Sequence, residues 1–386
     1  MSKARLKNEE DYREYVGIEP GPQYANQQYI SIDKDDMETK KFYVERIIRF
    51  LIQLMKAESP AFKRLYVDLF GGGSGYEGLK ITKPDEFDID ILMRIPEPAA
   101  PVLLENNIPG YVNLKLEHFQ RLQHKYPEVY EVMQDFVDDN NYLLTKEMKS
   151  SFMQSIFDRV MNTISNNTIQ VLGSDFRISR VQNLGPAFTL TIEGLNELKI
   201  SVDLVPCILL DGSQWPGEGF EPNPYTSPSD FFIVPKSPRR DVPHIDRYWR
   251  LSFQKQEREI IFDRQWLKPT IRVLKRIRDN FQHRISSYAI KTMFFRELKI
   301  GNPTLDDDTP ALWSLPFSYC VVHVRHMLLT VVEIYRPIVD ARGLRNLSTQ
   351  FQNSLLLEQE NGPFGRLNPR TKNTVQKRHR EHARRH

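Results

Sequence analysis

The chain has 386 residues, a formal net charge of +3 and 40% hydrophobic residues, enough apolar material to bury a large core. No apolar run approaches the roughly 18 residues of a membrane-spanning helix, so we expect no transmembrane segment. The two cysteines, Cys207 and Cys320, are too few for a disulfide scaffold or a zinc cluster, and both lie in apolar surroundings.

The chain opens with a polar leader, residues 1–34, which has no clear periodicity and no apolar core of a secretion signal. We therefore expect a cytoplasmic protein. A long amphipathic helix is predicted from Asp35, because acids there suit the positive end of a helix. Its apolar stripe consists of Val44, Ile48, Leu51 and Met55. Opposite much of this stripe lie the basic residues Arg46, Arg49 and Lys56.

Residues 71–90, GGGSGYEGLKITKPDEFDID, join a glycine-rich turn to three alternating acids. Side chains alternate between the faces of a strand, so the intervening apolar residues face a core and Glu86, Asp88 and Asp90 face the other way. Carboxylates this close repel one another unless a cation lies between them, and Mg²⁺ takes carboxylate and phosphate oxygens together. The pattern alone fits a metal site and a solvated strand face equally well.

The turn at 71–75 favours the metal site, because glycines let backbone N–H groups approach an anion closely. Residues 74–79 are predicted to form a short helix, whose N-terminal end favours phosphate. The spacing fits neither a Walker loop nor a dinucleotide fingerprint. A glycine–serine turn followed by paired acids suits a nucleoside triphosphate and its metal ions.

A second acidic strand is predicted at 198–210, LKISVDLVPCILL. Asp203 lies inside this apolar run, where an acid is costly unless it is paired or binds a metal ion. Two Mg²⁺ ions about 4 Å apart cannot be held by one strand alone. Asp203 is therefore the predicted third ligand beside Glu86 and Asp88, although an acid that simply faces solvent remains an alternative.

The rest of the chain reads as a connection, a helical part and a basic tail. Residues 211–230 are rich in Gly, Pro and Ser, and helical patterns dominate beyond about 244. A helix predicted from near Asp263 carries a basic residue every fourth position: Arg264, Lys268, Arg272 and Arg276. The tail, 366–386, holds eight Lys or Arg and one acid, which indicates disorder and either a binding role or simple solvation.

Four motifs in order, GGGSGYEGLKITKPDEFDIDILMRIP, SVDLVPCILL, YWRLSFQKQEREII and SSYAIKTMFF, resemble the cyclic GMP–AMP synthase family. The likeness covers roughly 35–365 and is strongest to animal receptors without a zinc insertion, many of them from insects. It implies a bilobed α/β (α+β) nucleotidyltransferase with a polymerase-β-like core, a mixed sheet, a long spine helix and a helical C-terminal lobe. The implied divisions are 1–34, 35–215, 216–365 and 366–386.

The resemblance also implies roles for particular residues. Gly73 and Ser74 match the pair that holds the donor triphosphate, and Glu86, Asp88 and Asp203 match the metal-binding, catalytic acids, whereas Asp90 does not. The further nucleotide-binding positions are Arg250 and Tyr288 at a base, and Lys275 and Ser287 at phosphates. Both predicted basic faces match surfaces where family members bind duplex nucleic acid.

The implied activity is synthesis of a cyclic dinucleotide of the cyclic GMP–AMP type from ATP and/or GTP, with Mg²⁺ or alternatively Mn²⁺. Because the zinc insertion is missing, no zinc is expected and DNA is in doubt as the activator. We expect double-stranded RNA to be the activator, with a dimer on nucleic acid as one arrangement, in innate antiviral signalling. Two alternatives are a transferase that makes uncyclised oligonucleotides and a catalytically silent scaffold.

Overall fold

The computed structural model describes residues 32–301 together with Asn26 and Ile30, and it leaves gaps at 82, 107, 182–186, 195–197, 217–229, 239–240, 263–266 and 281–284. The chain divides into two compact units, Ile32–Ile260 and a second that joins Met1–Ser31 to Ile261–His386. Most of the predicted leader, the whole basic tail and Cys320 lie outside the described residues. The predicted division between the lobes at 215 stays a prediction.

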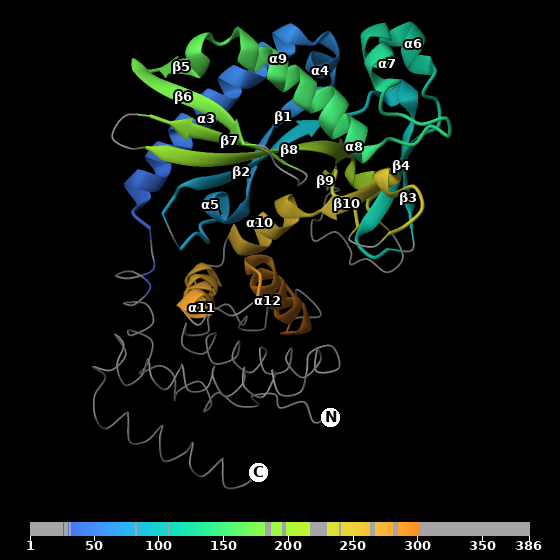
Figure 1. Cartoon of the computed structure of the whole chain (residues 1–386). Coiled ribbons are helices and arrows are strands. Elements are labelled where there is room, and N and C mark those ends of the chain that lie inside the picture. Colours follow the sequence, from blue (N-terminus) through green and yellow to red (C-terminus); the bar gives the residue numbers. More distant parts are fainter. Residues whose placement is uncertain are drawn as a thin grey trace, which may run out of the picture. The chain divides into compact units, whose positions relative to one another are not determined.

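A mixed ten-stranded sheet forms the centre of the larger unit (Figure 1). Its strands are β1 (Tyr66–Gly72), β2 (Glu86–Met93), β3 (Pro101–Glu105), β4 (Tyr111–Leu116), β5 (Thr168–Val171), β6 (Ser174–Val181), β7 (Phe188–Glu193), β8 (Lys199–Leu210), β9 (Phe231–Val234) and β10 (Tyr248–Ser252). The spatial order is β3-β4-β10-β9-β8-β7-β6-β5, with β2 beside β8 and β1 beside β2.

The longest of these strands, β8, confirms the strand predicted at 198–210. It pairs in parallel with β2 and antiparallel with β7 and β9. Most of its apolar residues are buried, including Val202 and Leu204 on either side of Asp203. The strand is therefore anchored on both edges, and its one acid projects from a fixed backbone.

The predicted spine helix is α3 (Lys34–Glu58), and Asp33 caps it by accepting hydrogen bonds from the backbone N–H groups of Asp35 and Asp36. All four residues of the predicted apolar stripe are buried in the main core. Helices α3, α4 (Pro60–Leu65) and α9 (Ser155–Thr163) lie on one side of the sheet, and the short α5 (Gly73–Glu77) lies on the other (Figure 1). The remaining helices of this unit include α6 (Arg121–Lys125), α7 (Pro127–Met133), α8 (Thr145–Glu147) and a π-helix, Met148–Gln154.

After β10 the chain is helical, as predicted, with α10 (Gln254–Phe262), α11 (Leu267–Asn280) and α12 (Ser287–Gly301). The basic helix, α11, begins at Leu267, and Arg264 lies outside the described residues. Leu267, Ile271 and Leu274 form its buried face. Among the residues described here, no helix has the length and apolar character to span a bilayer.

Candidate active site

Two of the predicted metal ligands lie side by side on neighbouring strands. In the parallel pairing of β2 with β8, Asp88 is the direct partner of Asp203. Adjacent strands are about 4.8 Å apart, and both side chains leave the face opposite the buried Phe87 and Val202. The register thus places two carboxylates against each other from segments more than a hundred residues apart.

This proximity is electrostatically unfavourable in the metal-free protein. Partial desolvation, followed by the negative charge of Asp203, raises the pKa of Asp88, while Lys80 opposes the rise. The Asp88 side chain remains exposed to solvent, which screens part of the repulsion. A cation between the two carboxylates would relieve the rest.

The Asp203 carboxylate has a partner that the sequence did not indicate. Thr189 on β7 is the antiparallel neighbour of Asp203, and its hydroxyl donates a hydrogen bond to Asp203 Oδ1. Thr189 is 7% exposed, so this contact is shielded from solvent. One carboxylate oxygen of Asp203 is thereby fixed in orientation.

The third predicted ligand, Glu86, is also engaged. Lys80 Nζ lies 2.8 Å from Glu86 Oε2 and 3.8 Å from Asp85 Oδ1. The Glu86 side chain is 74% exposed, whereas that of Lys80 is only 9% exposed. Nothing in the sequence distinguished Lys80 from an ordinary surface lysine.

Asp90 differs from the other two acids of β2, because it is buried rather than directed to solvent. Burial raises its pKa to about 7, and Oδ2 has no hydrogen-bond partner within the described residues. Its partner on β8 is Val205 instead of an acid. Asp90 thus projects from the predicted face of β2, but the alternative of a solvated face does not hold for it, because it is covered next to Gly72 of the glycine turn.

The glycine turn is packed directly against these acids. Gly73 has φ +66°, and a Cβ there would overlap Asp88 Oδ2, so no other residue fits without moving the carboxylate. Gly72 faces Gln254 in the same way. Arg258 donates a hydrogen bond to the Gly71 carbonyl, which ties α10 to the turn. Ser74 follows in the first turn of α5, so the turn, Ser74 and the acid pair are neighbours.

The acids meet only part of the requirement for a metal site. In the described part of the chain, no group of three or more His, Cys, Asp or Glu side chains is arranged to hold a metal ion. Asp88 and Asp203 offer the adjacent hard oxygen donors that Mg²⁺ or Mn²⁺ prefers. Glu86 completes the set only if it leaves Lys80.

The other predicted nucleotide-binding residues occupy both units. Arg250 lies half-buried on β10, in the unit of the acids. In the second unit, Lys275 is buried, and the Ser287 hydroxyl accepts a hydrogen bond from Arg278 at 2.8 Å. Tyr288 is 49% exposed and is therefore not a core residue, and Lys291 Nζ lies 5.6 Å from its ring centroid.

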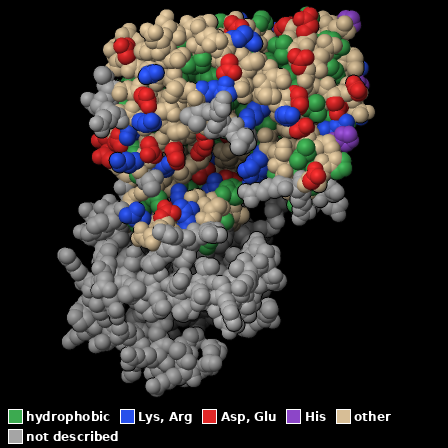
Figure 2. All heavy atoms as spheres, in the orientation of Figure 1, with side chains coloured by type: hydrophobic (Ala, Val, Ile, Leu, Met, Phe, Trp, Pro, Cys, Tyr) green, Lys and Arg blue, Asp and Glu red, His purple; other side chains and the backbone are tan. Residues whose placement is uncertain are grey.

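The basic face of α3 is partly occupied by contacts within the protein. Arg46 is exposed, but Arg49 lies 3.7 Å from Asp68, and the ammonium of Lys56 lies 3.8 Å from the Tyr66 ring centroid. Burial lowers the pKa of Lys56. Acidic and basic side chains are interspersed on the face shown in Figure 2. Arg46 itself lies 5.3 Å from the Phe42 ring centroid, so each of the three cations has a partner within the protein.

The basic residues of α11 also differ in exposure. Arg276 is exposed, whereas Lys268 and Arg272 are half-buried, and burial lowers the pKa of Arg272. The basic residues of α11 therefore do not form a uniformly solvated stripe. Arg276 is the position at which a charge reversal tests binding with least effect on folding.

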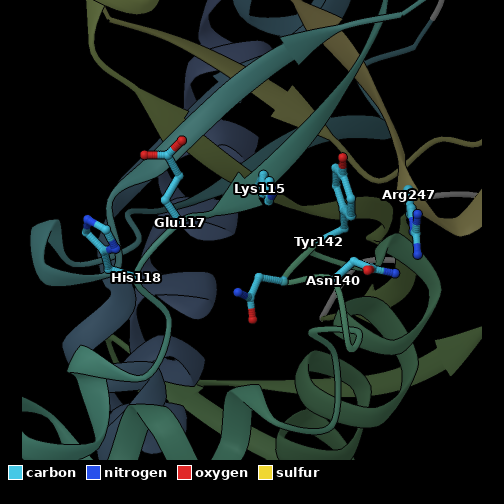
Figure 3. Close-up of a pocket in the computed structure, with 7 residues that line it drawn as sticks. Lys115, Glu117, His118, Asn140, Tyr142 and Arg247 are labelled. Atoms are coloured by element: carbon cyan, nitrogen blue, oxygen red, sulfur yellow. The ribbon is translucent and has the colours of Figure 1, made fainter.

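A separate polar cavity of about 760 Å³ lies at the end of β4, and none of the predicted site residues lines it (Figure 3). Arg247 and Lys115 flank the Tyr142 ring at 4.6 and 5.8 Å from its centroid. Arg247 is further fixed by Asp138 at 2.5 Å. The cavity contains no pair of facing carboxylates, so the acid pair beside the glycine turn remains the candidate active site.

Comparisons with known proteins identify the fold and the family of the chain. The Mab-21 protein nucleotidyltransferase domain matches residues 75–263. A cyclic GMP-AMP synthase-like receptor of Tribolium castaneum is 39% identical over 277 residues, covering 70% of this chain and 69% of the relative. One of Aethina tumida is 35% identical over 283 residues, covering 72% and 70%. Cyclic GMP-AMP synthase-like receptor 1 of Drosophila melanogaster is 28% identical over 294 residues, covering 74% and 75%.

The mixed sheet, the acid pair and the Mab-21 match define a nucleotidyltransferase with a polymerase-β-like core, which confirms the predicted fold class. More particularly, the chain belongs to the cyclic GMP–AMP synthase-like receptor family, as the four motifs indicated.

Proposed function

We propose that this nucleotidyltransferase synthesises a cyclic dinucleotide of the cyclic GMP–AMP type from ATP and/or GTP, when double-stranded RNA is bound. The observation that carries the proposal is the pairing of Asp88 with Asp203 beside the glycine turn. A phosphoryl-transfer site needs negative ligands for divalent cations next to a binding loop for the triphosphate. Here the glycine turn packs directly against Asp88 of the acid pair.

Glu86, Asp88 and Asp203 would hold Mg²⁺ or Mn²⁺, which supplies positive charge at the reacting phosphate and at the leaving pyrophosphate. Gly73 and Ser74 are the proposed triphosphate-binding residues, and Lys275 and Ser287 are further proposed phosphate-binding residues. Arg250 and Tyr288 hold bases, the latter by stacking its exposed ring. A ribose hydroxyl oxygen forms a new P–O bond to the α-phosphorus of the triphosphate, and its proton is released to solvent. The bond from the α-phosphorus to the bridging oxygen breaks, and pyrophosphate leaves. A second transfer of the same kind within the linear product closes the ring and releases the pyrophosphate of its remaining triphosphate.

The acids are tested by replacing Glu86 and Asp88 with Ala together. Pyrophosphate release should fall to background, because two of the three cation ligands are lost, while RNA binding persists. Mass spectrometry of the products, with and without nucleic acid, separates the proposal from its alternatives. Linear oligonucleotides would point to a non-cyclising transferase, and no product under any condition would point to a catalytically silent scaffold. Substantial turnover by the double variant would show that the acids are misassigned.

Activation by RNA is supported by the exposed cations Arg46 on α3 and Arg276 on α11. Duplex RNA is recognised mostly through backbone phosphates and groove shape, so activation should weaken steeply as salt is raised. Arg276→Glu should reduce stimulation, whereas Arg121→Glu, an exposed reversal on α6, should not. Equal activation by DNA of the same length would contradict the RNA preference. The proposed setting is innate antiviral sensing in the cytoplasm, with a dimer on nucleic acid as one arrangement.

A further inference from the structure

Lys80 is a buried lysine, which is unusual because lysine side chains are almost always exposed. It lies between α5 and β2, and its chain neighbours Leu79 and Ile81 are both buried, at 3% and 9% exposure. The Leu79 backbone N–H donates to the Ser74 carbonyl at 2.9 Å, so this segment is fixed to the glycine turn. The Lys80 side chain is therefore not free to extend into solvent.

A lysine that is 9% exposed needs a negative partner, because burial of an unpaired ammonium is costly. The partner in contact is Glu86, at 2.8 Å, while Asp85 lies a full ångström farther away. Glu86 is largely exposed and has no comparable need of Lys80. The ion pair is thus maintained because the buried ammonium of Lys80 needs a negative partner.

The contact has a further consequence, since Glu86 is one of the three proposed cation ligands. We propose that Lys80 is a positioning residue that holds Glu86 in the metal-free protein and competes with the divalent cation for its carboxylate. The inference rests on the proposed function of Glu86, Asp88 and Asp203. Occupation of the site then requires an exchange of partners, in which Glu86 moves to the cation and Asp85 remains beside Lys80.

The test measures binding of Mn²⁺ alone, by titration calorimetry and by the shift in melting temperature, without nucleotide or turnover. Lys80→Met removes the competitor and should lower the dissociation constant about threefold to tenfold, the range expected for an ion pair of this kind. Its melting temperature without metal should fall, because the acids lose their counter-charge. Its rise on adding Mn²⁺ should exceed that of the wild type.

Lys83→Met is the matched control, because Lys83 is an exposed lysine of the same loop with no recorded contact to Glu86 in the described chain. It removes the same charge nearby and reports the general electrostatic effect. Should Lys80→Met fold poorly, Lys80→Gln and a thermal double-mutant cycle with Glu86→Gln in chelator measure the same coupling.

The outcomes distinguish a wrong role for Lys80 from a wrong metal site. Equal Mn²⁺ affinity in Lys80→Met and Lys83→Met, or zero coupling in the cycle, would overturn the role of Lys80 while leaving the ligands intact. Unchanged Mn²⁺ binding in Asp88→Asn and Asp203→Asn would instead show that the proposed metal site is wrong.

Discussion

Asp88→Asn should stabilise the metal-free protein while it abolishes activity. Asp88 and Asp203 are direct partners on adjacent strands, and desolvation and mutual repulsion raise the pKa of Asp88. Because the folded pKa lies above the unfolded value of about 3.9, the ionised native state is disfavoured. Stability is therefore lost as pH rises through the interval between the two pKa values, and asparagine removes that loss.

The size of the effect follows from the spacing. Two unit charges about 4.8 Å apart repel by roughly 1 kcal/mol at the dielectric constant of water and by about 3.5 kcal/mol at an effective value of 20. Asp88 is exposed and Lys80 offsets part of the repulsion, so the lower figure applies. A gain of about 1 kcal/mol in the free energy of unfolding corresponds to about 2–4 °C in a unit of this size.

The assay is thermal unfolding in chelator at pH 7.5 and at pH 4, where most of the gain should disappear because pH 4 lies close to the unfolded pKa of about 3.9 and below the raised pKa of the folded protein. Asp139→Asn is the control, since Asp139 is exposed and has no recorded ion pair in the described chain. With Mn²⁺ added, the order should reverse, because only the wild type binds the ion well. A melting temperature below that of Asp139→Asn in chelator would refute the electrostatic reasoning.

Two further predictions concern the neighbours of this pair. Asp90→Asn should retain measurable activity, and because the pKa of Asp90 is raised to about 7, its stability advantage over wild type should grow between about pH 4 and pH 7 and stay constant above. A loss of activity as complete as that of Asp88→Asn would mean that Asp90 is a ligand. Thr189→Val should reduce kcat/KM roughly tenfold to a hundredfold, since Asp203 loses a charge-assisted hydrogen bond of about 1.5–3 kcal/mol. Thr191 lies two residues farther along β7, opposite Ser201, so Thr191→Val should leave activity unchanged. Equal losses of activity in both variants would indicate a general effect on β7.

Much of the scaffold could be predicted from local patterns. Alternation identified the strands that carry Asp88 and Asp203, and the apolar stripe identified α3, because each signal is contained in a short window of sequence. Alternation also assigned Asp90 to the correct face of β2. It could not show that this position is covered, because Gln254, which packs against the adjacent Gly72, comes from α10, far away in the chain.

Other parts of the site leave no local signal. The opposition of Asp88 and Asp203 depends on strand register, which two isolated strands do not specify. A threonine in a strand and a lysine in a turn are common, so Thr189 and Lys80 became recognisable only through their contacts. On α11, spacing by four predicted a solvated stripe, but the packing of the helix leaves Arg272 half-buried.

The parallel pairing of β2 with β8 joins Glu86 to Ser201, which are 115 positions apart in the chain. Closing so long a loop is entropically costly, so contacts of this kind form slowly during folding. The acid pair can exist only after the chain has been made through β8 and this closure is complete. A nascent or truncated chain ending before Asp203 would present the glycine turn and two of its acids without the third. Nucleotidyl transfer at this site would thus be confined to molecules in which the closure between β2 and β8 is complete.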